Sequence, residues 1–243
     1  MLDPVHDLLL EIARCDVAIA GAAGDLGQDH PCSRVIAFQG REDLNLLTPS
    51  TFHLPEPWQG DIARAPLLFI SSNPSINPCE HFPTAAWSDT DIINFFEGGF
   101  SSRARAQGRS RYWSSIHKRA LELFGRNPRP GIDYALTEVV RCKSRNEVGV
   151  PEALPHCAGR FLSETLRLSN ANVIFAVGEK ARRHLSNVLD LGQKRTGDVI
   201  DLEIGGRDLI IGFGAHPSSF GKQRIVNTFS PANMARMREA LLP

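Results

Sequence analysis

The segment Pro66-Leu67-Leu68-Phe69-Ile70-Ser71 is an unbroken apolar run that ends in a serine. A short continuous run of this kind, without polar alternation, is typical of a strand buried on both faces of a sheet. Residues 134–140 and 172–177 are also predicted to be strands. Helical patterns lie between and after these strands, at 89–97, 112–124, 151–168 and 179–189. Strands that alternate with helices predict an α/β fold with parallel pairing.

The flanking sequence completes this picture. Residues 199–204 and 207–213, separated by Gly205-Gly206, predict a hairpin whose second arm enters the sheet. Asp3 and Pro4 predict a helix start, as do Ser230 and Pro231. We therefore expect one domain over residues 1–243, with three α/β/α layers, a central, mostly parallel four-stranded sheet and an irregular N-terminal segment over 16–64.

Composition excludes several classes of protein. The 243 residues are 42% hydrophobic and 22% charged, as in a folded globular chain. The longest apolar runs are far shorter than the ~20 residues of a membrane span. The opening Met1-Leu2-Asp3-Pro4 lacks a basic signal-peptide region, and five cysteines do not indicate a disulfide scaffold. We expect a cytoplasmic protein with no membrane and no obligate protein partner.

The balanced net charge hides an asymmetry. Residues 1–100 carry four Arg and Lys against fourteen Asp and Glu, and the rest of the chain carries 23 basic and 13 acidic residues. The basic residues are densest between Arg103 and Arg129. Such a segment suits a polyanion such as nucleic acid, although a solvated helix face would have the same composition.

Two predicted strands are followed by loops that could carry chemistry. Ser71-Ser72-Asn73-Pro74-Ser75 follows the first strand, and Gly214-Ala215-His216-Pro217-Ser218-Ser219 follows the last. In parallel sheets ligands bind beyond the carboxyl ends of the strands. Each loop alone is also ordinary turn sequence. The chain has no G-x-S-x-G nucleophile elbow, no phosphate-binding G-x-x-x-x-G-K-[ST] loop and no H-E-x-x-H zinc pattern.

Together these loops resemble the two active-site motifs of the uracil-DNA glycosylase superfamily. Thr137-Glu138-Val139-Val140-Arg141-Cys142-Lys143, followed by Pro151-Glu152, Cys157 and Phe161-Leu162, resembles a segment of its iron–sulfur branches. Val173-Ile174-Phe175-Ala176-Val177-Gly178 resembles the strand that follows. The ordered set covers about residues 66–221. It implies a glycosylase fold and hydrolysis of the N-glycosidic bond of a flipped uracil, or of another deaminated or damaged base, in base excision repair.

The resemblance also implies roles for individual residues. Asn73 would orient the water or the cation-like sugar, and His216 would donate to the departing base. Ser72, Phe82 and Glu138 would bind the base, with Phe82 as the stacking floor and Trp87 and Phe95 as rivals for that role. The partner would be single- or double-stranded DNA, contacted by Ser75, Ser218, Ser219, Phe220, Lys222 and Arg224.

Glu138 departs from the family pattern, which has asparagine there. An ionised carboxylate can only accept hydrogen bonds, so Glu138 would have to be protonated to read both edge atoms of uracil. The alternative is that Glu138 pairs with an arginine such as Arg141 and does not meet the base.

The same resemblance implies a [4Fe–4S] cluster. Cys142 and Cys157 are separated by fourteen residues, a gap similar to that of the cluster-bearing branches. Cys15 and Cys32 would complete the four thiolates, although the family has a closer pair there. Otherwise all five cysteines are buried apolar residues. Two other functions remain open: a non-catalytic nucleic-acid-binding module on the same fold, and an unrelated small-molecule hydrolase.

Overall fold

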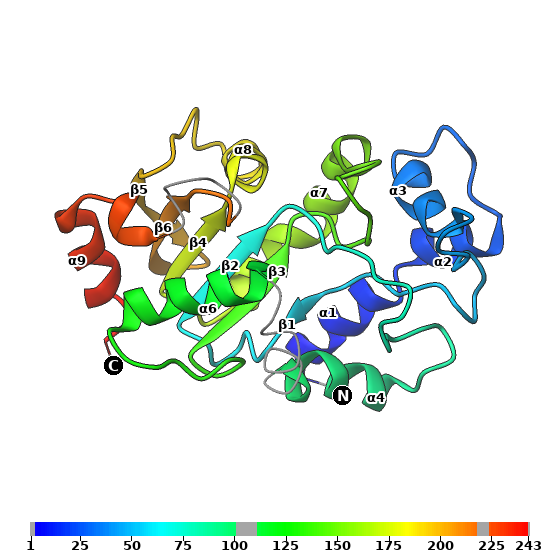
Figure 1. Ribbon diagram of the computed structural model, residues 1–243, viewed down its shortest axis with the longest axis horizontal. Coiled ribbons are helices and arrows are strands. Elements are labelled where there is room, and N and C mark those ends of the chain that lie inside the picture. Colours follow the sequence, from blue (N-terminus) through cyan, green and yellow to red (C-terminus); the bar gives the residue numbers. More distant parts are fainter. Residues whose placement is uncertain (1–2, 101–110, 218–223, 243) are drawn as a thin grey trace. The chain divides into compact units, whose positions relative to one another are not determined.

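The computed structural model describes residues 3–100, 111–217 and 224–242 (Figure 1). Its contacts divide the chain into two compact units, each built from three separate segments. The first, which we call the helical unit, comprises residues 1–57, 72–96 and 138–165. The second, the sheet unit, comprises residues 58–71, 97–137 and 166–243. Neither unit is therefore a continuous stretch of sequence.

A sheet of six strands, in the order β1-β3-β2-β4-β6-β5, lies at the centre of the sheet unit. Strands β2 and β6 flank β4 in parallel, whereas β1 pairs with β3, and β5 with β6, in antiparallel fashion. The strands are β1 (Trp58–Gln59), β2 (Leu67–Ser71), β3 (Tyr134–Glu138), β4 (Val173–Val177), β5 (Val199–Ile204) and β6 (Arg207–Gly214).

The α/β prediction is thus confirmed, but the expected number of four strands is wrong. Strand β1 is only two residues long, too short for a sequence pattern. Strand β5 joins the sheet because the Gly205-Gly206 turn folds it directly back on β6. Both glycines have positive φ, 60° and 77°, as a tight hairpin turn requires.

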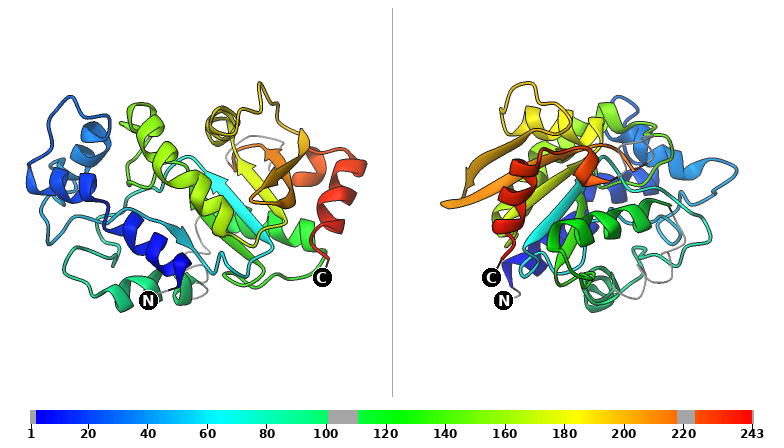
Figure 2. Two further views of the ribbon diagram at one scale, coloured as in Figure 1. Left: turned by 180° about the vertical axis from the view of Figure 1, so that it is seen from behind. Right: turned by 60° about the vertical axis from the view of Figure 1, so that its left-hand side comes forward.

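The central strands β2, β3 and β4 are buried on both faces of the sheet. On one face, the strands pack against helices α6 (Arg111–Phe124) and α9 (Pro231–Glu239). The hydrophobic cluster between them includes Phe69, Tyr134, Phe175, Ile116, Leu123 and Met237. The alternate residues of these strands, whose side chains point to the other face of the sheet, are buried as well; examples are Leu68, Ile70 and Ile174. Helix α8 (Glu179–Val188) packs against β2 and β4 (Figure 2). The remaining element is the short 3-10 helix η3 (Ile225–Asn227).

The helical unit contains most of the N-terminal half. Its elements are α1 (Pro4–Ala13), α2 (Asp16–Ala23), α3 (Ser33–Ala37), η1 (Phe38–Gly40), α4 (Asp89–Ile93) and most of α7 (Val150–Leu168); the π-helical turn η2 (Asn94–Gly98) follows α4. Asp3 caps α1 by accepting from Val5 N, with Pro4 in the first turn, as expected. The segment 16–64, expected to be irregular, nevertheless forms α2 and α3.

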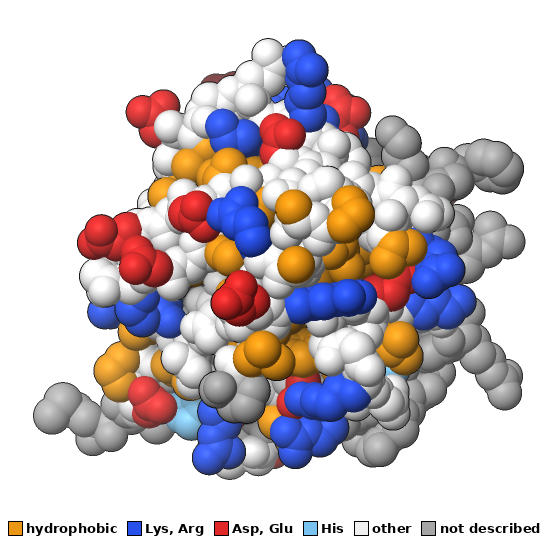
Figure 3. Space-filling view, turned by 90° about the vertical axis from the view of Figure 1, so that its left-hand side faces the viewer, with side chains coloured by type: hydrophobic (Ala, Val, Ile, Leu, Met, Phe, Trp, Pro, Cys, Tyr) orange, Lys and Arg blue, Asp and Glu red, His pale blue; other side chains and the backbone are white. Residues whose placement is uncertain are grey.

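The surface of the sheet unit around α9 and β5 carries both signs of charge (Figure 3). Arg236 of α9 pairs with Asp201 of β5 at 2.6 Å. Arg236 and Asp201 therefore neutralise each other. Among the residues described, none of the helices has the length and apolarity needed to cross a bilayer.

Candidate functional site

The loop after β2 is held by the segment that follows β3. Val140 N donates to Ser72 O at 2.9 Å, and Ser144 N donates to Pro74 O at 3.1 Å. All four residues belong to the helical unit. The structure therefore joins the first motif of the sequence to the segment that carries Cys142 and Lys143.

Asn73 is anchored through its amide nitrogen. Nδ2 donates to Ser144 Oγ at 3.1 Å, to Ser144 O at 3.4 Å and to Pro74 O at 3.1 Å. Within the described ranges no hydrogen bond reaches Oδ1, and the side chain is half-buried. The free carbonyl oxygen can accept a hydrogen bond from a water molecule, the function predicted for this residue.

Two neighbouring serines have contrasting environments. Ser72 Oγ is buried and has no hydrogen-bond partner among the described residues, whereas Ser75 is exposed. A buried hydroxyl group without a partner is unfavourable. The Ser72 hydroxyl thus remains unsatisfied among the described residues, and Ser75 is accessible to solvent.

Phe82 lies under a buried cation. Lys143 Nζ is 3.5 Å from the centroid of the Phe82 ring, 2.9 Å from Glu80 Oε2 and 3.7 Å from Glu56 Oε2. The Lys143 side chain is only 3% exposed. Cation–π attraction and two carboxylates together offset the cost of burying the ammonium group.

His53 covers the same phenylalanine. Its ring stacks on Phe82 with the centroids 5.1 Å apart, and Phe95 and Phe96 meet the Phe82 ring edge-on. Burial, reinforced by the nearby charge of Lys143, lowers the pKa of His53 to about 4, so the ring is neutral at pH 7. Phe82 is therefore packed on several sides. The rival aromatics, Trp87 and Phe95, are half-buried and contact each other at 5.7 Å.

Glu138 is buried close to Arg141. Burial lowers the pKa of Arg141 to about 10, while Cys157 and Glu138 act to raise it. The guanidinium group is held by Pro57 O at 2.6 Å and Thr165 Oγ1 at 3.0 Å. This environment favours the alternative in which Glu138 interacts with Arg141 and does not read a base.

His216 follows β6 in the sheet unit and is exposed. It lies against Gly178, which follows β4: a Cβ built on Gly178 would be 3.2 Å from His216 Cβ and Cδ2. Gly178 also has a φ of 93°, which disfavours other residues. The loops after β4 and β6 therefore meet, and glycine permits the close approach.

The predicted site residues divide between the units. Ser72, Asn73, Ser75, Phe82 and Glu138 belong to the helical unit, and His216 and Arg224 belong to the sheet unit. Four of the predicted DNA contacts, Ser218, Ser219, Phe220 and Lys222, lie outside the described residues. Arg224 is exposed and pairs with Glu122 at 3.0 Å.

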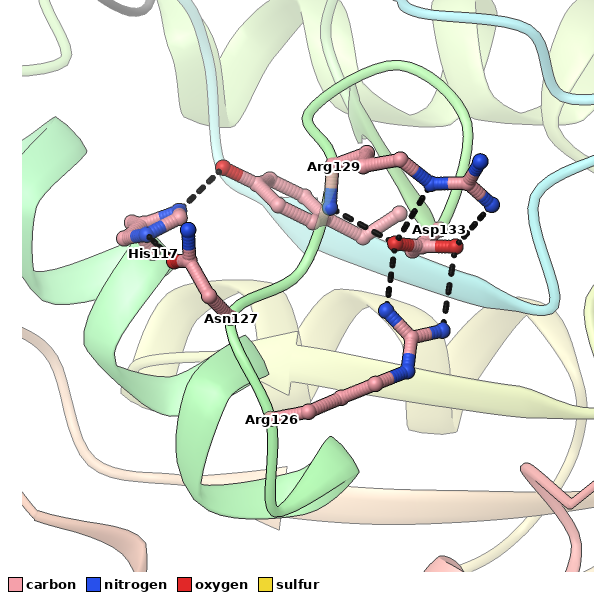
Figure 4. A network of polar contacts seen from close by, with 6 residues as sticks. His117, Arg126, Asn127, Arg129 and Asp133 are labelled. Atoms are coloured by element: carbon pink, nitrogen blue, oxygen red, sulfur yellow. Dashed lines mark hydrogen bonds and ion pairs between the residues drawn. The ribbon is translucent and has the colours of Figure 1, made fainter.

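The end of the basic segment is involved in an internal network (Figure 4). Arg126 and Arg129 both bind Asp133, at 2.9 and 3.0 Å. Burial raises the pKa of Asp133, but the two guanidinium groups and Arg129 N outweigh it and hold the pKa well below its usual range. His117 Nδ1 contacts Tyr134 Oη at 3.1 Å, and its Nε2 contacts Asn127 Oδ1 at the same distance.

This network also constrains where DNA could bind. Asp133 precedes β3, and Figure 1 shows the arrows of β2, β3 and β4 pointing the same way. Arg126 and Arg129 thus lie at the edge of the sheet opposite the carboxyl ends. Arg119 is only 2% exposed. These three arginines do not have the environment expected of a DNA-facing surface, and residues 101–110 are outside the described part.

Four cysteines line one apolar cavity of the helical unit. They are Cys15, Cys32, Cys142 and Cys157, and Arg141, His156 and Phe161 line the same cavity. All four thiols are buried, and burial raises the pKa of each, that of Cys32 to about 12. Cys79 is exposed and does not belong to this group. The sequence prediction selected these four residues.

Among the described residues, no three His, Cys, Asp or Glu side chains are arranged to hold a single metal ion. A four-iron cluster has a different requirement, because each thiolate binds its own iron and the sulfurs need not converge on one point. Four thiols around one apolar cavity fit that donor set.

Comparison with known proteins adds no assignment: no family model matches the sequence, and no curated protein is significantly similar to it. Sequence reasoning assigned no role to Ser144, Lys143 or His156. Ser144 directly follows the quoted Thr137–Lys143 motif, which was the available signal; the other two are recognised only from their surroundings in the fold.

Proposed function

We propose that the protein is a DNA glycosylase that hydrolyses the N-glycosidic bond of a flipped uracil or another deaminated or damaged base. The observation that carries the proposal is the geometry of Asn73. Its amide nitrogen is fixed by Ser144 and Pro74, and its carbonyl oxygen is free to accept from a water molecule. The likeness of the strand-end loops to the glycosylase motifs supports the same function.

The chemistry requires few groups. The bond from the sugar C1′ to the base nitrogen breaks with its electron pair on the base, which leaves a cation-like sugar and an anionic base. The water held by Asn73 Oδ1 adds to C1′ and releases a proton to the solvent. His216 donates to the O2 side of the base, where negative charge develops. No nucleophile with a lowered pKa is needed.

The loops that carry Asn73 and His216 both follow strands of the parallel part of the sheet. Strands β2 and β6 both run parallel to β4, so their carboxyl ends open on the same edge of the sheet. The loop of Asn73 begins at the end of β2, and the loop of His216 begins at the end of β6. Ligands of open parallel sheets bind at such an edge, where the order of connections reverses.

We propose further that the four-thiol cavity holds a [4Fe–4S] cluster bound by Cys15, Cys32, Cys142 and Cys157. Bound there, the cluster would cross-link the segments that carry its ligands. One of these segments ends in Ser144, which anchors Asn73. The chain's own contribution is the buried thiols, the donor Arg141 N at 3.4 Å from Cys157 Sγ, and an apolar wall that excludes water.

A second function has its own support. The ring expected to stack on a flipped base, Phe82, is covered by Lys143 and His53. A nucleic-acid-binding protein that lacks a base pocket would not cleave the glycosidic bond. We therefore retain the non-catalytic binding module as the alternative.

The experiment is a panel of oligonucleotides that contain uracil, hypoxanthine or xanthine, in single and double strands. Base release is read as alkali-labile sites, and binding is measured on the same substrates. Release of one base supports the glycosylase, and binding without release supports the module. If the protein neither binds these substrates nor releases a base from them, both functions are contradicted and the small-molecule hydrolase is favoured.

A further inference from the structure

His156 lines the four-thiol cavity and carries a buried ring nitrogen. This residue lies on α7, directly before Cys157, and lines the cavity together with the four cysteines. Its Nε2 is buried and has no hydrogen-bond partner among the described residues. A buried imidazole nitrogen without a partner is unfavourable, so an orphaned atom of this kind points to an absent group.

The orientation of the His156 ring is defined by a neighbour. His30 meets it edge-on, with the ring centroids 5.0 Å apart. His30 Nδ1 in turn accepts from Cys32 N at 3.1 Å. The ring contact thus connects His156 to the segment of Cys32, and in the chain His156 directly precedes Cys157. His156 is therefore a fixed part of the cavity wall.

We propose that His156 is a positioning residue that donates a hydrogen bond from Nε2–H to a sulfur atom of the iron–sulfur cluster. This inference rests on the proposed cluster. Four thiols already supply one ligand for each iron, so the imidazole is not needed as a ligand. Cluster and thiolate sulfurs would be acceptors for this nitrogen, and an Nε2–H group of imidazole is a donor.

The hydrogen bond has a measurable consequence. Hydrogen bonds to the sulfurs help to set the reduction potential of a cluster, because they stabilise the more negative, reduced form. Losing one should lower the equilibrium constant for one-electron reduction about tenfold, which corresponds to ~59 mV. The potential should move to a more negative value.

The test compares three variants, each reconstituted anaerobically with iron and sulfide. His156→Leu removes the donor, His156→Gln keeps an N–H group at the end of a side chain of similar length, and His81→Leu alters an exposed histidine of the same unit. Iron content and reduction potential are measured by colorimetry and by protein-film voltammetry. Circular dichroism reports whether each variant is folded.

We expect His156→Leu to have a more negative reduction potential, which corresponds to an about tenfold lower equilibrium constant for reduction. The potentials of His156→Gln and His81→Leu should remain near that of the wild type. A folded His156→Leu that loses iron, while His156→Gln retains it, also supports the inference. An unchanged potential in an iron-loaded His156→Leu overturns the inference alone. A folded wild-type protein that takes up no iron overturns the cluster and the inference together.

Discussion

Asn73 Nδ2 lies 3.1 Å from Ser144 Oγ, and this contact fixes which end of the amide is available. The backbone oxygen of Ser144 is a second acceptor at 3.4 Å. With the nitrogen directed at Ser144, the Asn73 carbonyl oxygen can be directed at a water molecule. Ser144 is itself 2% exposed, so its position is set by packing.

The first prediction concerns this contact. Ser144→Ala should lower kcat about fivefold, because one neutral hydrogen bond is worth about 1 kcal/mol, and should leave KM nearly unchanged. Ser144→Thr, which retains a hydroxyl group, should recover most of the rate. Thr90→Ala, at an exposed position of α4, is the control. A raised KM with an unchanged kcat would contradict a positioning role.

The second prediction concerns the buried ammonium group of Lys143. Lys143→Met preserves most of the volume but leaves Glu80 and Glu56 without their cation. We expect the free energy of unfolding at pH 7 to fall by ~3–5 kcal/mol, the usual cost of removing one partner from a buried ion pair. Urea denaturation measures it. Adding Glu80→Gln to Lys143→Met should recover part of the loss, and a change below ~1 kcal/mol would show that the pair is not buried in solution.

The third prediction is a pH dependence. The pKa of His53 falls from 6.5 to about 4 in the folded protein, mainly through burial. The unfolded chain therefore binds more protons between these values, and the folded state loses stability as pH falls from about 6.5 towards 4. The loss attributable to His53 should be on the order of 1–3 kcal/mol. His53→Phe, which can keep the stacking, should flatten this part of the profile in denaturation experiments. An identical slope in both proteins would rule out His53 as its source.

The fourth prediction tests the cluster. Anaerobically purified wild-type protein should be brown and contain about four irons per chain. Cys142→Ser should lose the colour and most of the iron, whereas Cys79→Ser, at the exposed cysteine, should retain both. Colourless, iron-free and stably folded wild-type protein would mean that the four thiols are ordinary core residues.

Local sequence determined the parts of the fold that could be predicted. The apolar runs of β2 and β4 are buried at every position, so their continuous pattern identified them. Strand β5 is half-exposed along its length, yet the Gly205-Gly206 turn identified it from the sequence as the first arm of a hairpin with β6. Helix α2 lacks a strong apolar face, and both α2 and α3 form ion pairs with the distant helix α7, Asp16 with Arg160 and Arg34 with Glu152. Propensity alone therefore placed them in an irregular region.

The candidate site was predictable to a similar degree. Asn73 and His216 follow strands, a relationship that sequence alone reveals. The sequence does not reveal that Lys143 and His53 cover Phe82, because this contact joins three segments that are separated by tens of residues. The cysteines show both cases. The spacing of Cys142 and Cys157 was informative, whereas only the fold brings Cys15 and Cys32 to the same cavity.

The most direct test of the glycosylase assignment is the single-turnover rate of base release by Asn73→Ala. The matched control is Asn77→Ala, which alters an exposed asparagine of the same loop. With the base that the wild-type protein releases best, Asn73→Ala should be at least tenfold slower, and up to about 10²–10³-fold, since it loses a transition-state hydrogen bond. Affinity for the oligonucleotide should be nearly unchanged, and Asn77→Ala should match wild type. A wild-type protein that binds the oligonucleotides without releasing a base, or an Asn73→Ala variant at the wild-type rate, would contradict the assignment.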